Sequence, residues 1–220
     1  MYNIDIENYP EKETVDMSIV TMCICTDGIC CVTDSRVLDE NKEIVSDEIF
    51  KSTIIKNVNG YDLLVGIAGA GTVGDKEIIH ILNERFDNTS IKVEFGIENL
   101  LYTVCSYLQT IKTDNLETSV VFGYYENNQP RIAIFEVSRV GINSLFTTSR
   151  YVIVGEGQAR EDMNNAVNAL PLSTVDEFAR QCIKATRDII DKHKDEKNYG
   201  VGGYVNVIAL DKHGAKNISL

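Results

Sequence analysis

Ser18 and Asp34 are the two residues whose types and spacing first suggest chemistry, because they place a hydroxyl and a carboxylate at the two ends of one predicted hairpin. The intervening sequence consists of two largely apolar segments joined at Asp27-Gly28. Asp-Gly between two apolar, β-type segments is a strong hairpin signal. In a hairpin, the start of the first strand lies beside the end of the second. A serine would therefore stand next to a carboxylate, which suits a nucleophilic reaction centre.

A serine hydroxyl is a weak nucleophile until a base takes its proton. A Ser-His-Asp triad is not favoured, because the sequence has no Gly-x-Ser-x-Gly elbow and its histidines, His80, His193 and His213, have no motif context. A chain that began at Ser18 would have another base. Its own α-amino group, with an unperturbed pKa of about 8, would accept the proton directly or through water.

Several short motifs then occur in the order typical of proteasome β-type subunits and HslV-like bacterial peptidases: Ser18, Asp27-Gly28, Asp34-Ser35-Arg36, Lys51 and Ala68-Gly69. The chain resembles these N-terminal nucleophile hydrolases from Ser18 to its C-terminus, most clearly before about residue 157. The spacing from Ser18 to Asp34 fits without a gap, and the segment that leads to Lys51 is one residue longer.

The resemblance implies a catalytic role for four residues. Ser18 would be the nucleophile, and its amine the base. Lys51 would lower the pKa values of the amine and hydroxyl through its charge, and Asp34 would orient Lys51 by a charge-assisted hydrogen bond. The N–H of Gly69 would face the developing oxyanion, and such a donor lowers the barrier by roughly 3–4 kcal/mol. Three further residues are expected to bind substrate: Ile67, Ser35 and Gly71.

Each of these residues also has a structural explanation. Ser18 leads a strand, Asp34 and Lys51 suit a structural ion pair, and Gly69 and Gly71 suit a turn before a helix. The sequence also departs from the family pattern. Serine replaces the commoner threonine, the later Asp-x-x-Ser-Gly element has no clear counterpart, and Gly-Ser-Gly is replaced by Gly155-Glu156-Gly157. A carboxylate near the amine would raise the pKa of that base.

Residues 1–17 are polar and acidic and lack periodicity, so we interpret them as an N-terminal extension. The resemblance implies a propeptide that is removed by self-cleavage before Ser18. Translation from Met17, followed by removal of that methionine, would expose the same residue. In the alternative, the extension stays attached. No linker interrupts residues 18–220, so we expect one domain there.

Composition and charge limit the classes of partner and the cellular compartment that we expect. The chain has 220 residues, 44% of them apolar, and a net charge of −12. That charge argues against nucleic acid and anionic membranes as partners, and the absence of a signal peptide or apolar span favours the cytoplasm. Six cysteines suit free thiols there. Without paired Cys-x-x-Cys spacing, we expect the four in the hairpin to be buried apolar residues rather than ligands of a metal or cofactor: Cys23, Cys25, Cys30 and Cys31.

The remaining pattern predicts strands covered on both faces and four helices with one apolar side, the last of which opens with a capping box at Thr174 and Glu177. Together with the resemblance, this predicts a four-layer α/β/β/α sandwich of two antiparallel sheets with helices outside.

The predicted reaction is amide-bond hydrolysis of polypeptides through an acyl-enzyme on Ser18. The resemblance implies a homo-oligomeric ring and an ATP-dependent unfoldase as partner. Three alternatives stay open. They are a catalytically inactive structural or assembly subunit, a small-molecule amidohydrolase of the same fold, and a plain binding module.

Overall fold

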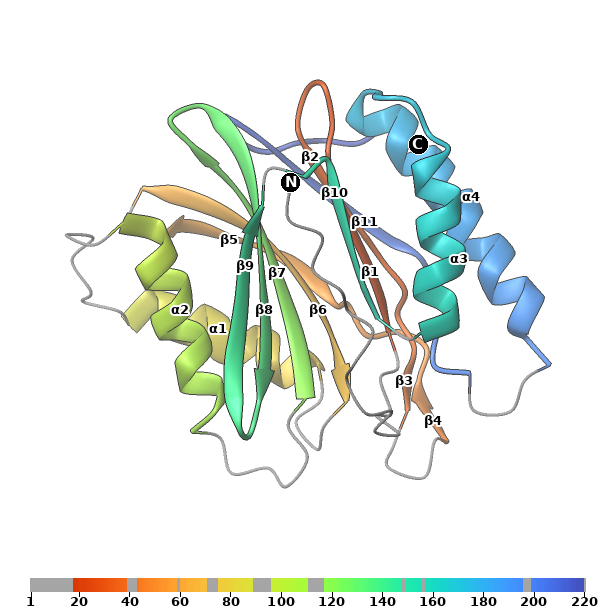
Figure 1. The fold of residues 1–220 in the computed structure, drawn as a ribbon, viewed down its shortest axis with the longest axis horizontal. Coiled ribbons are helices and arrows are strands. Elements are labelled where there is room, and N and C mark those ends of the chain that lie inside the picture. Colours follow the sequence, from red (N-terminus) through yellow and green to blue (C-terminus); the bar gives the residue numbers. More distant parts are fainter. Residues whose placement is uncertain are drawn as a thin grey trace.

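The computed structural model describes most of the chain after the N-terminal extension (Figure 1): residues 18–38, 43–58, 60–70, 75–88, 96–110, 117–147, 149–155, 157–195 and 199–219. The extension 1–17, Gly71 and Glu156 therefore lie outside the described residues.

Two five-stranded antiparallel sheets form the centre of the molecule. Strand order in the first sheet is β10-β1-β2-β11-β12, and in the second it is β5-β6-β7-β8-β9. The first sheet contains β1 (Ile19–Ile24), β2 (Ile29–Thr33), β10 (Tyr151–Gly155), β11 (Asn206–Asp211) and β12 (Gly214–Ala215). The second sheet contains β5 (Ser52–Val58), β6 (Tyr61–Ala70), β7 (Glu117–Glu126), β8 (Gln129–Ser138) and β9 (Gly141–Thr147). A separate small hairpin pairs β3 (Val37–Leu38) with β4 (Ile44–Ser46).

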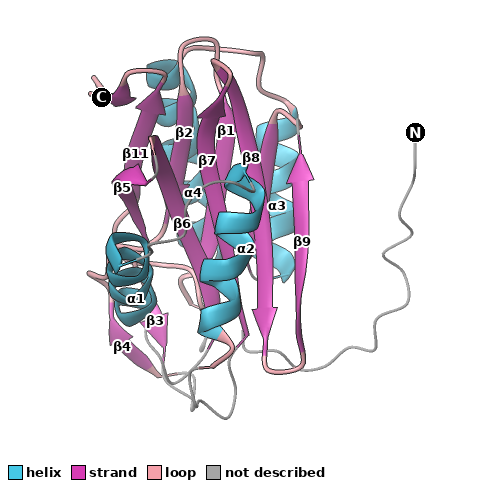
Figure 2. Cartoon of the chain, turned by 90° about the vertical axis from the view of Figure 1, so that its left-hand side faces the viewer, coloured by secondary structure: helices cyan, strands magenta, loops and turns pink. Residues whose placement is uncertain are grey.

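The sheets pack face to face, and helices cover both outer faces (Figures 1 and 2). Helices α1 (Asp75–Asn88) and α2 (Gly96–Leu108) cover the second sheet, whereas α3 (Gly157–Asn168) and α4 (Val175–His193) cover the first. The predicted four-layer α/β/β/α sandwich is confirmed. None of the described helices combines the length and the apolar character that crossing a bilayer requires.

Strand β1 shows why both faces of its sheet are apolar. Val20 and Met22 pack between the two sheets, whereas Ile19 and Cys23 pack against α3 and α4. Side chains alternate between the faces of a strand, so a strand buried on both sides needs apolar residues at nearly every position.

The β1–β2 hairpin forms as its Asp-Gly turn predicts. The N–H of Cys25 donates to the carbonyl of Gly28 at 2.8 Å and closes the turn. The Asp27 carboxylate accepts the N–H of Val175 at 2.8 Å and so ties the turn to the start of α4. A Cβ atom on Gly28 would lie 2.9 Å from the carbonyl oxygen of Leu210, so glycine is needed at this close approach.

The start of α4 also follows the sequence prediction. The Thr174 hydroxyl accepts the N–H of Glu177, and the Glu177 carboxylate accepts the N–H of Thr174. This reciprocal capping box satisfies two backbone donors that a helix start otherwise leaves unpaired.

Candidate active site

Ser18 directly precedes β1 and is 1% exposed. The neighbouring strand position is Gly155, which pairs with Ile19 and has a φ of +140°. A Cβ atom at Gly155 would lie 2.0 Å from the Ser18 carbonyl oxygen. Glycine at this position therefore lets the backbone of Ser18 occupy its place at the end of the sheet.

Lys51 reaches the Ser18 hydroxyl from the start of β5. Its Nζ lies 2.5 Å from Ser18 Oγ and 3.2 Å from Asp34 Oδ1, and it also donates to the carbonyl oxygen of Arg36. These acceptors match the three protons of an ammonium group. Because the side chain is 0% exposed, its charge depends on these partners.

Asp34 follows β2 and is fully buried. Its Oδ1 accepts the N–H of Ile19 at 2.9 Å as well as the Lys51 ammonium, and its Oδ2 accepts the N–H groups of Gly202 at 3.1 Å and Arg36 at 3.2 Å. Burial raises the pKa of the Asp34 carboxyl, although the Lys51 charge and the N–H donors oppose this shift. The carboxylate is thus held by four donors from four parts of the chain.

The arrangement of Ser18, Lys51 and Asp34 suits nucleophilic chemistry. A fixed cation beside a hydroxyl oxygen stabilises the alkoxide form and any negative charge that develops next to it. Because neither Lys51 nor Asp34 is exposed, the electrostatic contact is not weakened by solvent as a surface pair is.

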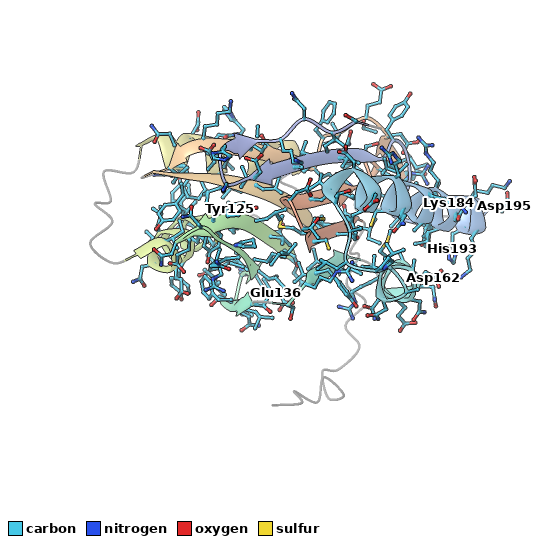
Figure 3. The ribbon with its side chains drawn as sticks, turned by 90° about the horizontal axis from the view of Figure 1, so that it is seen from above. Tyr125, Glu136, Asp162, Lys184, His193 and Asp195 are labelled. Carbon is cyan, nitrogen blue, oxygen red and sulfur yellow. The ribbon has the colours of Figure 1, made fainter. Side chains whose placement is uncertain are left out.

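The three histidines lie in other parts of the molecule. His80 pairs with Glu84 on α1, and His213 is in the turn between β11 and β12. His193, at the end of α4, lies beside Asp162 of α3, as Figure 3 shows, and stacks on the ring of Tyr199. They accordingly supply no Ser-His-Asp arrangement with Ser18.

Gly69 lies near the end of β6. A Cβ atom there would lie 2.6 Å from the Cα of Thr118, so the close approach of β7 excludes a side chain. The N–H of Ile67 donates to the carbonyl of Lys51 at 2.9 Å. Since N–H groups two residues apart point to the same edge of a strand, that of Gly69 points beyond the start of β5. This direction is compatible with its predicted oxyanion role, which stays a prediction.

Two residues predicted to bind substrate have contacts within the protein. Ile67 is fully buried in the cluster between the second sheet and helices α1 and α2. The Ser35 hydroxyl donates to the carbonyl of Asp47 and accepts the N–H of Tyr204 at 2.7 Å. Both sets of contacts are structural, and a substrate role for either residue stays a prediction.

Sequence reasoning missed the groups that surround this trio. Arg36 forms an ion pair with Asp47, and the loop that carries Gly202 and Gly203 lies against both. The signal in the sequence was the glycine-rich segment before β11.

The six cysteines are free thiols, and the four in the hairpin are buried as expected. Cys105 and Cys182 are buried as well. Among the described residues, no group of three or more His, Cys, Asp or Glu side chains is placed to hold a metal ion. Cys23 and Cys30, which lie opposite each other in the hairpin, instead pack with Cys182 of α4 in the apolar layer beneath that helix.

No protein-family model matches the sequence, and no curated protein matches it. Solved structures do match. Anbu from Hyphomicrobium sp. strain MC1 is 12% identical with a TM-score of 0.67, and the match covers 90% of this chain and 85% of that chain. Anbu (ancestral beta-subunit) from Yersinia bercovieri is 13% identical with a TM-score of 0.64, and the match covers 91% and 86%. The Anbu complex from Pseudomonas aeruginosa, described as a helical assembly, is 16% identical with a TM-score of 0.65, and the match covers 88% and 81%.

These matches correct the resemblance inferred from the sequence. That resemblance pointed to proteasome β-type subunits and HslV-like peptidases, and at the level of the family it is wrong. The motifs that suggested it, Ser18 to Gly69, are short, and their order does not separate related groups. The fold of this chain is that of the Anbu proteins, which are related to those two groups but distinct from them.

Proposed function

We propose that this chain is an N-terminal nucleophile hydrolase with the Anbu fold, which cleaves amide bonds through an acyl-enzyme on Ser18. One observation supports the proposal above all. A buried lysine ammonium lies 2.5 Å from the Ser18 hydroxyl, and a carboxylate with four donors holds that ammonium in place. A buried charge is costly, and a serine hydroxyl beside it gains reactivity.

In the proposed reaction, Ser18 Oγ attacks the substrate carbonyl carbon while its proton passes to the free α-amino group of the same residue. Lys51 stabilises the negative charge at the reaction centre, and the Gly69 N–H donates to the oxyanion. The amine proton then passes to the leaving nitrogen. Water attacks the resulting ester, which releases the acid and restores the hydroxyl.

This reaction needs a free amine on Ser18, so the mature chain must begin there, either after self-cleavage or after translation from Met17 and removal of that methionine. Below its pKa, which for an unperturbed α-amino group is about 8 and which the Lys51 charge would lower, the amine is protonated and cannot act as a base. We therefore expect the rate of hydrolysis to rise with pH through the range in which the amine of the processed protein loses its proton.

The proposed substrates are polypeptides, and the proposed quaternary structure is a homo-oligomer. Support for the oligomer comes from one relative of the same fold, the Anbu complex described as a helical assembly. An ATP-dependent unfoldase as partner follows from the original resemblance only. Six buried free thiols suit a reducing compartment, so we place the protein in the cytoplasm.

The structural contacts of the same residues favour a second candidate, a non-catalytic subunit. The Asp34–Lys51 pair links β2 to β5, and Ser18 completes its hydrogen bonds. This candidate predicts that residues 1–17 stay attached in the assembled particle.

Intact mass and N-terminal sequencing of the assembled particle test both candidates. A chain that starts at Ser18, and hydrolysis of an unfolded polypeptide that Ser18→Ala abolishes, are the expected results. Turnover of small amides without cleavage of polypeptides would identify a small-molecule amidohydrolase. Cleavage by an assembled protein that retains residues 1–17 would contradict the mechanism.

A further inference from the structure

We propose that the ion pair between Arg36 and Asp47 is a clasp that sets the position of the Lys51 ammonium beside Ser18. This inference rests on the proposed function and adds two positioning residues to it. In the part of the chain that the structure describes, neither the Arg36 guanidinium nor the Asp47 carboxylate hydrogen-bonds to the Ser18 hydroxyl. Arg36 acts on the Lys51 ammonium through its own carbonyl, and Asp47 acts through the main chain that leads to Lys51.

The ion pair between Arg36 and Asp47 has a two-point geometry that fixes the orientation of the guanidinium. Arg36 Nε donates to Asp47 Oδ1 at 2.8 Å, and Nη2 donates to Oδ2 at 3.2 Å. Two parallel hydrogen bonds prevent rotation of the guanidinium about its own plane. The side chains are 19% and 40% exposed, so solvent screens their attraction and the pair adds little to stability. The pair instead contributes by fixing the orientation of the Arg36 side chain.

Two glycines hold the neighbouring loop against this pair. A Cβ atom at Gly202 would lie 2.3 Å from the Arg36 Cζ, and one at Gly203, which has a φ of +72°, would lie 2.5 Å from the carbonyl oxygen of Asp47. Arg36 Nη1 also donates to the carbonyl of Tyr199 at 3.4 Å. The guanidinium is therefore enclosed by main chain as well as by its partner carboxylate.

The main chain of Arg36 reaches into the site. Its N–H donates to Asp34 Oδ2 at 3.2 Å, and its carbonyl accepts one proton of the Lys51 ammonium. Asp34 Oδ1 and Ser18 Oγ are further acceptors of that ammonium. If the Arg36 carbonyl moved away, the ammonium would lose one of its fixed acceptors and would shift toward the negative charge of Asp34, away from Ser18.

Asp47 ties the other side of the clasp to Lys51. It lies four residues before Lys51, and its carbonyl accepts the Ser35 hydroxyl. The N–H of Ile49 donates to the carbonyl of Ser35 at 3.2 Å. Besides the bond from Lys51 to the Arg36 carbonyl, the segment that ends in Lys51 is thus bound to the segment that carries Arg36 at three points. A change at either end of the ion pair is transmitted to the ammonium.

The test is the rate at which a serine-directed electrophile, a peptidyl β-lactone, acylates Ser18 in the assembled, processed protein, followed by intact mass across a pH series. The variants are Asp47→Asn, Arg36→Met, Arg36→Lys and the double variant Asp47→Asn/Arg36→Met. Glu126→Gln is the matched control, because it breaks the partly exposed Arg131–Glu126 pair in another part of the second sheet.

We expect Asp47→Asn to lower the acylation rate by roughly 10- to 100-fold, the effect of a small misplacement of a reacting group. The half-saturating concentration of the lactone should stay unchanged, and the rising limb of the pH profile should move to higher pH. Arg36→Lys should not restore the rate, because an ammonium cannot form the two-point contact. The double variant should be no slower than Arg36→Met, since both changes remove one interaction.

The ¹⁵N resonance of Lys51 Nζ separates failure of the clasp from failure of the proposed function. If the wild-type protein is not acylated at Ser18, the proposed function is wrong, and the clasp is judged by this signal alone. It should move in Asp47→Asn and not in Glu126→Gln. An unmoved signal in Asp47→Asn, or acylation of that variant with the wild-type rate and pH profile, would overturn the clasp.

Discussion

The Lys51 Nζ lies 2.5 Å from Ser18 Oγ in a site where the two side chains are almost fully shielded from solvent. A buried lysine needs an opposite charge close by, and the Asp34 carboxyl group lies 3.2 Å from its Nζ. The three residues are therefore energetically one unit. A change in one of them alters the cost of burying the others, and single substitutions must be interpreted with their doubles.

Lys51→Met tests this unit through stability. It leaves the Asp34 carboxylate buried without its cation, which typically costs about 3–5 kcal/mol of unfolding free energy. The double variant Lys51→Met/Asp34→Asn carries no buried charge and should recover much of that loss, while both variants lose hydrolysis. Urea unfolding of the two proteins measures the difference. Equal free energies of unfolding would show that Lys51 and Asp34 are not coupled.

Gly155→Ala tests the backbone beside the nucleophile. A methyl group at Gly155 would collide with the Ser18 carbonyl, and its φ of +140° is unfavourable for alanine. We expect at least tenfold slower acylation of Ser18 and a lower free energy of unfolding. Gly157→Ala is the control, because a Cβ atom there meets nothing within 4 Å. If the two variants acylate equally fast, the placement of the Ser18 carbonyl does not matter for the reaction.

The sequence was sufficient to predict those structural elements that depend on residues close together in the chain. The hairpin follows from Asp27-Gly28 between apolar segments, the start of α4 from Thr174 and Glu177, and the layered sandwich from strands that are apolar on both faces. The structure also brings Ser18, Asp34 and Lys51 into contact, because all three flank strands of the two packed sheets. Their catalytic roles stay predictions.

The surroundings of the trio could not be predicted, because their contacts join distant parts of the chain. Gly202 donates to Asp34 across 168 residues, and Arg36 reaches the Tyr199 carbonyl across 163. Such pairs have no periodicity and no spacing rule, since they depend on where a loop crosses another segment. The ion pair with Asp47 is closer in sequence, but acidic residues are frequent between Arg36 and Lys51 and none stood out.

Asp27 should make stability depend on pH. Burial raises the pKa of its carboxyl, but the Val175 N–H and Lys216 outweigh this, and the pKa is lowered overall. The unfolded chain, with a pKa of about 3.9, binds the proton more readily than the folded one, so the contribution is present above about pH 4 and is lost as pH falls further. Asp27→Asn should therefore differ from wild type by less than about 1 kcal/mol at neutral pH, and by less still in acid. Urea unfolding at several pH values measures this, and a difference that grows in acid would contradict it.

The cysteines should be unreactive in the native protein. All six are buried, which keeps reagents away from them, and burial raises the pKa of Cys31 to about 12. The hydrogen bond with Cys25 lowers the pKa of Cys23, so burial is the protection that all six share. A thiol reagent such as dithionitrobenzoate should then modify them only when the protein opens, and the labelling rate should rise with urea in parallel with unfolding. Val140→Cys supplies the control, because Val140 is 97% exposed and a thiol there should react at once. Rapid labelling of the wild-type protein at low urea would show instead that the layer beneath α4 opens without global unfolding.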